Sequence, residues 1–156
     1  MAEGLEERIG RLEDIQAITE VLYRYAHHID RGELDDFLEI FTPDLRYRVR
    51  MRNLEGGFDD KADFTGRDAL RQFAQMVYQS IWGPGKSGQV NVITQPLITW
   101  NGDTATALTY HTLVKGSTEG REVTSYGRYR DELRRCEDGK WRIASRIAEV
   151  ESVNPK

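Results

Sequence analysis

The chain reads Tyr25-Ala-His-His-Ile-Asp30-Arg-Gly-Glu-Leu-Asp-Asp-Phe-Leu-Glu-Ile-Phe41-Thr-Pro-Asp44 from the end of one predicted helix, through a second, to a turn before a predicted strand. This stretch places a tyrosine, two histidines and an aspartate at the end of an apolar helical stripe. Ionisable groups beside a core face are costly unless they are paired, hydrated or used in chemistry. The stretch therefore predicts a candidate acid–base site, without identifying a substrate.

Three helices are predicted in the N-terminal half. Residues 5–29 carry apolar side chains at steps of three and four, which is typical of an amphipathic helix. Gly32 suits the left-handed residue beyond a helix end, so we expect the helix to stop there. A second helix is predicted over 33–41, followed by a turn over 42–44. A third helix follows Thr65-Gly66 and ends near Ile81.

The remaining segments predict strands. Residues 45–54 alternate apolar side chains with arginines, which indicates a strand with one solvated face. Residues 55–63 are predicted as a loop, and further strands are expected over 90–100, 104–114, 122–134 and 140–153. On the last strand, inward-facing Ile143 and Ile147 predict that Arg146 faces outward. Helices followed by antiparallel strands indicate an α+β fold, in a single domain of residues 1–156.

Composition excludes several classes of protein. The formal net charge of −4 argues against a general phosphate-binding surface, so we expect no nucleic-acid partner. Cys136 is the only cysteine, which excludes an internal disulfide and a cysteine metal cluster. No three-ligand metal group is visible, so no metal is expected. No run approaches the roughly 18 apolar residues of a membrane span, and the charged N-terminus, which has no apolar stretch, predicts that there is no signal peptide. A cytoplasmic protein is therefore expected.

Several short motifs stand in a characteristic order. They are Tyr25-x-x-x-x-Asp30-x-Gly32, Phe64-Thr-Gly66-Arg67, Asn101-Gly-Asp-x-Ala105, Gly127-Arg-Tyr129 and Gly139-Lys-Trp141. Together they resemble the SnoaL-like branch of the nuclear transport factor 2-like superfamily. The resemblance implies a cone-shaped fold, in which a curved antiparallel sheet wraps around about three helices and encloses a deep pocket.

The same resemblance implies an activity. Similar proteins include dehydratases, isomerases and cyclases that use acid–base chemistry without a cofactor. A small hydrophobic substrate is expected, of a polycyclic, polyketide, steroid-like or aromatic kind. The arginine-rich strand face also suggests self-association, so we expect a homodimer or homotrimer. The β subunits of ring-hydroxylating dioxygenases share the fold without catalysing a reaction, so fold alone does not decide the function.

Two candidate catalytic residues lie at the end of the first helix. Asp30 matches the helix-end aspartate of the dehydratase-like relatives and could act as a base or hold a histidine in one tautomer. The alternative is a carboxylate that only hydrogen-bonds the next turn. Tyr25 matches a pocket tyrosine and could donate to a carbonyl oxygen. The alternative for Tyr25 is a core aromatic side chain.

The candidate proton carriers are histidines. His27 is three residues before Asp30 and is better placed than His28 to share a pocket with it. His111 lies in mid-strand on a face of small apolar side chains, where it is either a proton carrier or a core histidine. Tyr47 and Trp82 are weaker candidates, as a second pocket hydroxyl and as part of the pocket rim.

Asn91 departs from the family pattern. It stands where the dehydratases carry a catalytic histidine, and asparagine can orient or donate but cannot accept a proton. Three alternatives stay open. His111 or His27 supplies the imidazole from another wall, or Asp30 works without one, or the protein is not an enzyme. In the last case it resembles a non-catalytic dioxygenase β subunit, or it is a protein that only binds a small ligand.

Overall fold

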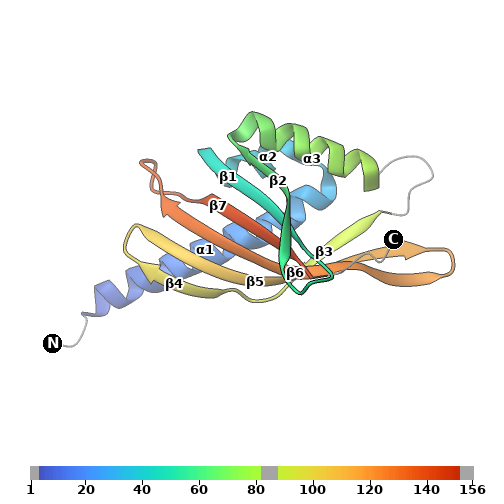
Figure 1. Ribbon diagram of the computed structural model, residues 1–156. Coiled ribbons are helices and arrows are strands. Elements are labelled where there is room, and N and C mark those ends of the chain that lie inside the picture. Colours follow the sequence, from blue (N-terminus) through green and yellow to red (C-terminus); the bar gives the residue numbers. More distant parts are fainter. Residues whose placement is uncertain (1–3, 82–87, 152–156) are drawn as a thin grey trace.

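The computed structural model describes residues 4–81 and 88–151, which form three helices and seven strands (Figure 1). Two helices come first, the third follows the second strand, and the last five strands end the described chain. The helices are α1 (Leu5–Arg31), α2 (Leu34–Glu39) and α3 (Arg67–Ile81). The strands are β1 (Phe41–Arg52), β2 (Phe58–Thr65), β3 (Gln89–Ile93), β4 (Leu97–Asn101), β5 (Thr104–Ser117), β6 (Gly120–Arg135) and β7 (Trp141–Val150).

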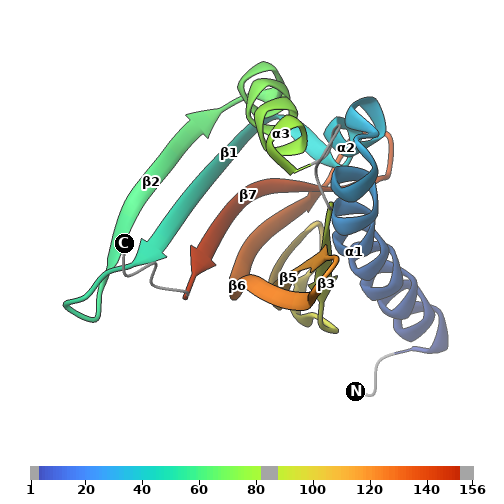
Figure 2. The same cartoon turned by 90° about the vertical axis from the view of Figure 1, so that its right-hand side faces the viewer.

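The strands form one open sheet. Its order is β2-β1-β7-β6-β5-β3, and β4 pairs with the other end of β5. β1 and β7 run parallel, whereas the remaining pairs are antiparallel. Figure 2 shows the sheet curving around the side on which the helices lie. The α+β class and the curved sheet are therefore confirmed, with two corrections: the sheet is mixed and it does not close into a barrel.

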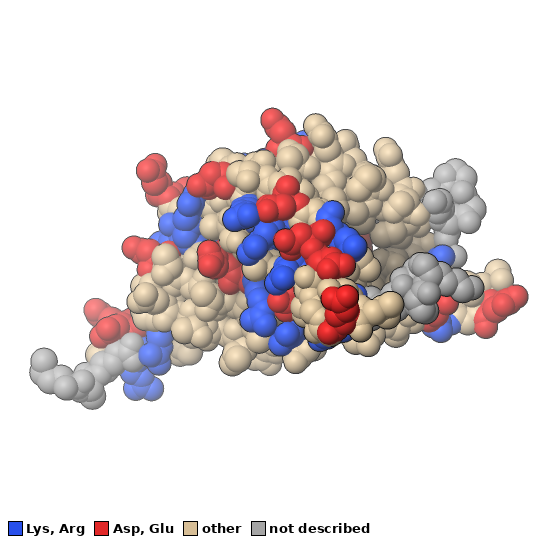
Figure 3. Space-filling view, viewed as in Figure 1, with Lys and Arg blue, Asp and Glu red and all other residues tan. Residues whose placement is uncertain are grey.

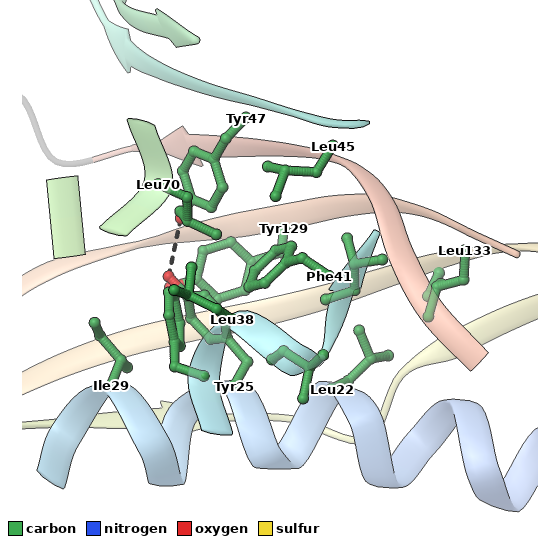
Figure 4. Packing of buried hydrophobic residues seen from close by; sticks show 14 of the residues in the cluster. Leu22, Tyr25, Ile29, Leu38, Phe41, Leu45, Tyr47, Leu70, Tyr129 and Leu133 are labelled. Carbon is green, nitrogen blue, oxygen red and sulfur yellow. Dashed lines mark hydrogen bonds between the residues drawn. The ribbon is translucent and has the colours of Figure 1, made fainter. Parts of the chain in front are cut away.

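The core lies between the helices and the concave face of the sheet (Figure 4). The apolar stripe predicted for α1 is confirmed, because its members are buried: Ile18, Leu22, Tyr25, Ala26 and Ile29. The stripe meets aromatic rings from α2 and β1, with ring centroids of Tyr25 and Phe37 5.3 Å apart. Burial of such rings is the main favourable contribution to folding and holds the helices against the sheet.

The loop predicted over 55–63 is wrong from Phe58 onward, because β2 begins there. Aspartate is a poor strand former, but cross-strand charge pairs offset this preference. Asp63 pairs with Arg46 at 2.7 Å, and Asp60 pairs with Arg50 at 3.0 Å. The strand predicted over 90–100 is interrupted after Ile93. The proline that follows has no N–H to donate to a sheet ladder. The predicted turn over 42–44 lies within β1.

The predicted outward orientation of Arg146 is also wrong. In the pairing of β6 with β7, Glu132 lies opposite Ser145 and Leu133 lies opposite Ile143, so Ala144 is an extra residue. Such a β-bulge shifts the alternation of side chains by one position. Arg146 consequently faces the interior and is only 1% exposed.

Charged side chains of both signs interleave on the face of the molecule turned toward the viewer in Figure 3. Ion pairs join β1 to β2, and Glu149 on β7 pairs with Arg128 and Arg130 on β6. On β1, Arg46 and Arg50 pair with Asp63 and Asp60 of β2, in keeping with the predicted solvated strand face. Among residues 4–81 and 88–151, no helix is both long and apolar enough to cross a membrane.

The end of α1 supplies a test of the fold. Gly32 has φ 68° and caps the helix through its N–H, and an added Cβ there would meet the Tyr78 ring at 2.6 Å. We expect Gly32→Ala to lower the free energy of unfolding by about 1–3 kcal/mol, since both strain and a clash arise. Gly10 is the matched control, because it lies inside α1 with nothing within 4 Å of an added Cβ. Gly10→Ala should raise stability by roughly 0.5–1 kcal/mol. Urea denaturation measures both, and equal effects would contradict the prediction.

Candidate active site

A cavity of about 170 Å³ lies within the concave side of the sheet. All three helices and several strands line it, so its walls come from residues far apart in the sequence. Its polar lining residues are Tyr25, Tyr47, Asn91, His111, Ser125 and Tyr129. Its apolar lining residues are Ile29, Phe37, Val49, Phe73, Val77, Leu113, Ala148 and Val150. Four of the predicted site residues therefore share one cavity.

Two tyrosines form a hydrogen-bonded pair in this cavity. The hydroxyls of Tyr25 and Tyr47 lie 2.9 Å apart (Figure 4). One hydroxyl donates to the other, so the hydrogen of the accepting hydroxyl is left for another acceptor. Burial, first of all, raises the pKa of Tyr47 and of Tyr129 well above the ordinary value. These phenols therefore remain protonated donors across the physiological pH range.

The guanidinium of Arg146 packs against the rings of two tyrosines, Tyr25 and Tyr129. It lies 3.9 Å from the ring centroid of Tyr25 and 4.1 Å from that of Tyr129. Asp131, whose side chain is fully buried, accepts two hydrogen bonds from it, at 2.7 and 2.9 Å. Burial opposes the charged form of Arg146, but the charge and hydrogen bonds of Asp131 outweigh it and raise the pKa above the ordinary value. The ion pair thus fixes two of the cavity's rings.

His111 is the most unusual group in the cavity wall. It is 3% exposed, and its ring stacks on Tyr129 with centroids 4.3 Å apart and planes 15° apart. Within the described residues, neither ring nitrogen has a hydrogen-bond partner of good geometry. Gly127 lies opposite His111 in the sheet, and a Cβ there would come within 3.0 Å of His111 Nε2. A buried imidazole whose nitrogens have no well-aligned protein partner is costly, so it requires an explanation.

Burial controls the protonation of His111. Desolvation lowers its pKa to about 4; the backbone carbonyl of Glu149 opposes this shift, and the charge of Arg146 adds to it. At neutral pH the ring is therefore uncharged, with one nitrogen able to accept a proton and the other able to donate. A neutral histidine next to protonated phenols combines a base with hydrogen-bond donors in one cavity.

Asp30 does not line this cavity. Its carboxylate accepts one hydrogen bond from the backbone N–H of Asn91 at 2.9 Å and one from Asn91 Nδ2 at 2.6 Å. Burial raises the pKa of Asp30, while the two Asn91 donors and then the charge of His27 oppose the shift. Asn91 Oδ1 in turn accepts a hydrogen bond from the Tyr129 hydroxyl at 3.4 Å. Asp30 therefore reaches the cavity only through Asn91.

The other predicted residues lie elsewhere. His27 is exposed and borders, with Asp30, a separate cleft of about 380 Å³ that shares Asn91 with the cavity. Trp82 lies outside the described residues. Although no metal group is visible in the sequence, folding brings ligand atoms of His28, Glu33 and Asp36 within 4.8 Å of one another. This group lies at the surface, where His28 Nδ1 already bonds Glu33 at 2.7 Å, and we assign no metal to it.

Sequence reasoning overlooked Tyr129, Ser125 and the Arg146–Asp131 pair. Tyr129 and Asp131 could have been found, because strict alternation over 127–133 places both on the same strand face as Leu133. Arg146 could not, because its orientation depends on a bulge. Ser125 continues the same alternation toward the start of β6, so it too could have been found.

Solved structures of three proteins from Novosphingobium aromaticivorans are similar to this chain. An NTF2-like protein with a cystatin-like fold is 23% identical, with a TM-score of 0.79 and coverage of 100% of this chain and 94% of that one. The β subunit of a provisionally assigned aromatic-ring-hydroxylating dioxygenase is 18% identical, with a TM-score of 0.74 and coverage of 92% and 93%. A provisionally assigned scytalone dehydratase is 17% identical, with a TM-score of 0.71 and coverage of 91% and 87%. At these identities the likeness concerns the fold.

Sequence comparison identifies the family itself. No curated protein matches the chain. The model of the SnoaL-like domain matches residues 10–147, which include every described residue that lines the cavity except Ala148 and Val150. The fold, with its helices inside a curved sheet, agrees with this match. The chain therefore belongs to the SnoaL-like domain family.

Proposed function

We propose that the protein is a cofactor-independent lyase or isomerase that moves a proton next to a carbonyl group of a small apolar substrate. One observation carries this proposal: His111 is buried and neutral and lacks a well-aligned protein partner in the described chain, beside protonated tyrosine hydroxyls. Core histidines are ordinarily hydrogen-bonded. Ligand groups that bond both nitrogens would account for the exception.

The proposed reaction begins at the carbon next to the carbonyl. The free nitrogen of His111 takes the proton, and the electron pair left behind moves onto the carbonyl oxygen to form an enolate. The Tyr25–Tyr47 pair donates its available hydrogen to that oxygen, where negative charge develops. The imidazolium then returns the proton, either to another carbon in an isomerisation or to a leaving hydroxyl in an elimination of water.

Asp30 acts as a positioning residue in this proposal. Its two hydrogen bonds orient the Asn91 amide, and Asn91 Oδ1 orients the Tyr129 hydroxyl. Tyr129 stacks on His111, so the chain of contacts from Asp30 ends at the base. His27 is exposed and lines the separate cleft rather than the cavity, so it takes no part in the transfer.

Deuterium exchange tests the proposal without knowledge of the natural substrate. Ketones of one to four fused rings are incubated with the protein in deuterated buffer, and loss of the proton next to the carbonyl is followed by NMR. We expect at least one ketone to exchange faster with the protein than with buffer alone. No acceleration for any member of the series would contradict the proposal.

The pH dependence of this exchange gives a sharper signature. His111 is an active base only when it is neutral, so kcat/KM should stay level from neutral pH downward and fall only near pH 4. An unperturbed histidine would lose activity near its ordinary pKa of about 6.5. Asp30→Asn is the control. The fall of kcat/KM near pH 4 should remain in this variant, because its residue 30 can no longer titrate. A fall centred near pH 6.5 would contradict a base whose pKa is lowered by burial.

A non-catalytic assembly subunit is the second candidate. Asn91 occupies the position of the family histidine and bonds Asp30, and a dioxygenase β subunit has a similar fold. This candidate predicts a stable complex with an iron-bearing partner and no exchange of any ketone. The expected homodimer or homotrimer stays a prediction, which light scattering of the purified protein tests.

A further inference from the structure

The size of the cavity limits what it can hold. Its volume is about 170 Å³. An engineered apolar protein cavity of about 150 Å³ binds benzene. The space beside His111 is therefore suited to one six-membered ring, whereas ligand sites for larger molecules typically measure about 300–1,000 Å³.

The walls resist enlargement because their rings pack on one another. Tyr47 stacks on Phe64 with centroids 5.4 Å apart, and Phe73 lies 5.6 Å from Tyr47 and 5.3 Å from Phe64. The guanidinium of Arg146 lies against the rings of Tyr25 and Tyr129. Moving one ring outward would disturb this packing, and close-packed interiors oppose such changes.

The polar groups define the chemistry of that ring. Neutral His111 has one nitrogen that accepts and one that donates, and neither has a well-aligned partner among the described residues. The Tyr25–Tyr47 pair offers one further hydrogen. A ring that carries an oxygen substituent can satisfy these groups, either as a hydroxyl donating to His111 or as a carbonyl accepting from the tyrosine pair.

We infer that the substrate is a compound with a single six-membered ring that carries a carbonyl group, such as a cyclohexenone, and that phenol is a non-reacting ligand of the same size. The inference rests on the proposed function, since the cavity is taken to be the active site. It narrows the substrate class from the wide range that the SnoaL-like resemblance implies. A ligand with two fused rings should therefore bind more weakly than one with a single ring in a cavity of about 170 Å³.

Binding of simple probes tests the inference separately from catalysis. Phenol, benzene and 2-naphthol are titrated into the protein in a calorimeter, with ligand-observed NMR for weak binding. We expect phenol to bind at least tenfold more tightly than 2-naphthol and benzene. We also expect His111→Gln to weaken the binding of phenol more than the binding of benzene, because the glutamine lacks the imidazole nitrogens. Binding of 2-naphthol as tight as that of phenol, or no binding of phenol, would overturn the inference.

Enlarging the cavity provides the matched comparison. Val77→Ala and the larger change Phe73→Ala remove wall atoms, so each should raise the affinity for 2-naphthol relative to phenol at least fivefold. Val90→Ala makes the same chemical change outside the cavity and should leave the ratio unaltered. If phenol binds selectively but no ketone exchanges deuterium, the proposed function fails while the size limit stands. If a ketone of several rings exchanges deuterium and phenol does not bind, the size limit fails while the proposed function stands.

Discussion

Replacing Asp131 with asparagine is expected to lower the free energy of unfolding by about 3–5 kcal/mol, because Arg146 would remain buried without a counter-charge. Both side chains are almost completely enclosed, and the aspartate accepts two of the guanidinium's hydrogen bonds. A protein of this size has a total stability of roughly 5–15 kcal/mol. The change therefore removes a large part of it, as urea denaturation followed by circular dichroism would measure.

Two variants separate burial from charge. Asp63→Asn makes the same chemical change in an exposed pair with Arg46, and it should cost at most about 1 kcal/mol. The double variant Asp131→Leu with Arg146→Met removes both charges and should recover most of the loss, since apolar replacement of a buried ion pair is often neutral. Equal costs for Asp131→Asn and Asp63→Asn would show that the buried pair contributes nothing special.

Replacing His111 with glutamine is expected to slow ketone exchange by about 10²–10⁴-fold, which is the usual contribution of a positioned general base. Glutamine keeps a polar group of similar length, but it cannot take a proton. The neutral imidazole, whose pKa burial lowers to about 4, can. The rate constants are compared by NMR at neutral pH and saturating ketone, so that weaker binding does not enter the comparison.

The control for this variant lies two residues earlier on the same strand face. Thr109 is 1% exposed and does not line the cavity, so Thr109→Ser should leave the exchange rate within about twofold of the wild type. Melting curves of both variants show whether the fold is retained. If a folded His111→Gln protein exchanges protons at the wild-type rate, the imidazole is not the base.

The helices and the sheet were predictable where local patterns coincide with tertiary packing. The apolar stripe of α1 and the glycine after it mark the helix and its end. Both signals are local, because the spacing of the apolar residues predicts the buried face and the glycine predicts the left-handed residue that follows. β2 was not predictable in this way. Its aspartates favour a loop locally, and only the distant arginines of β1 make it a strand.

The site was predictable in its parts but not in its arrangement. Tyr25, Tyr47, Asn91 and His111 come from four separate elements and meet in one cavity. Spacing along α1 places Asp30 beside the core, yet it cannot reveal that Asn91 supplies donors to both carboxylate oxygens. That contact joins residues far apart in sequence. It holds the Asp30 carboxylate in the separate cleft, outside the cavity.

The extra residue in β7 has a consequence for how related chains are aligned. Before Ala144 the odd-numbered positions point into the protein, and after it the even-numbered positions do. A homologue that lacks this insertion therefore matches β7 only if a one-residue gap is opened at that point. Without the gap, the interior arginine of one chain is set against a surface side chain of the other, and an equivalent cationic support of the cavity goes unrecognised.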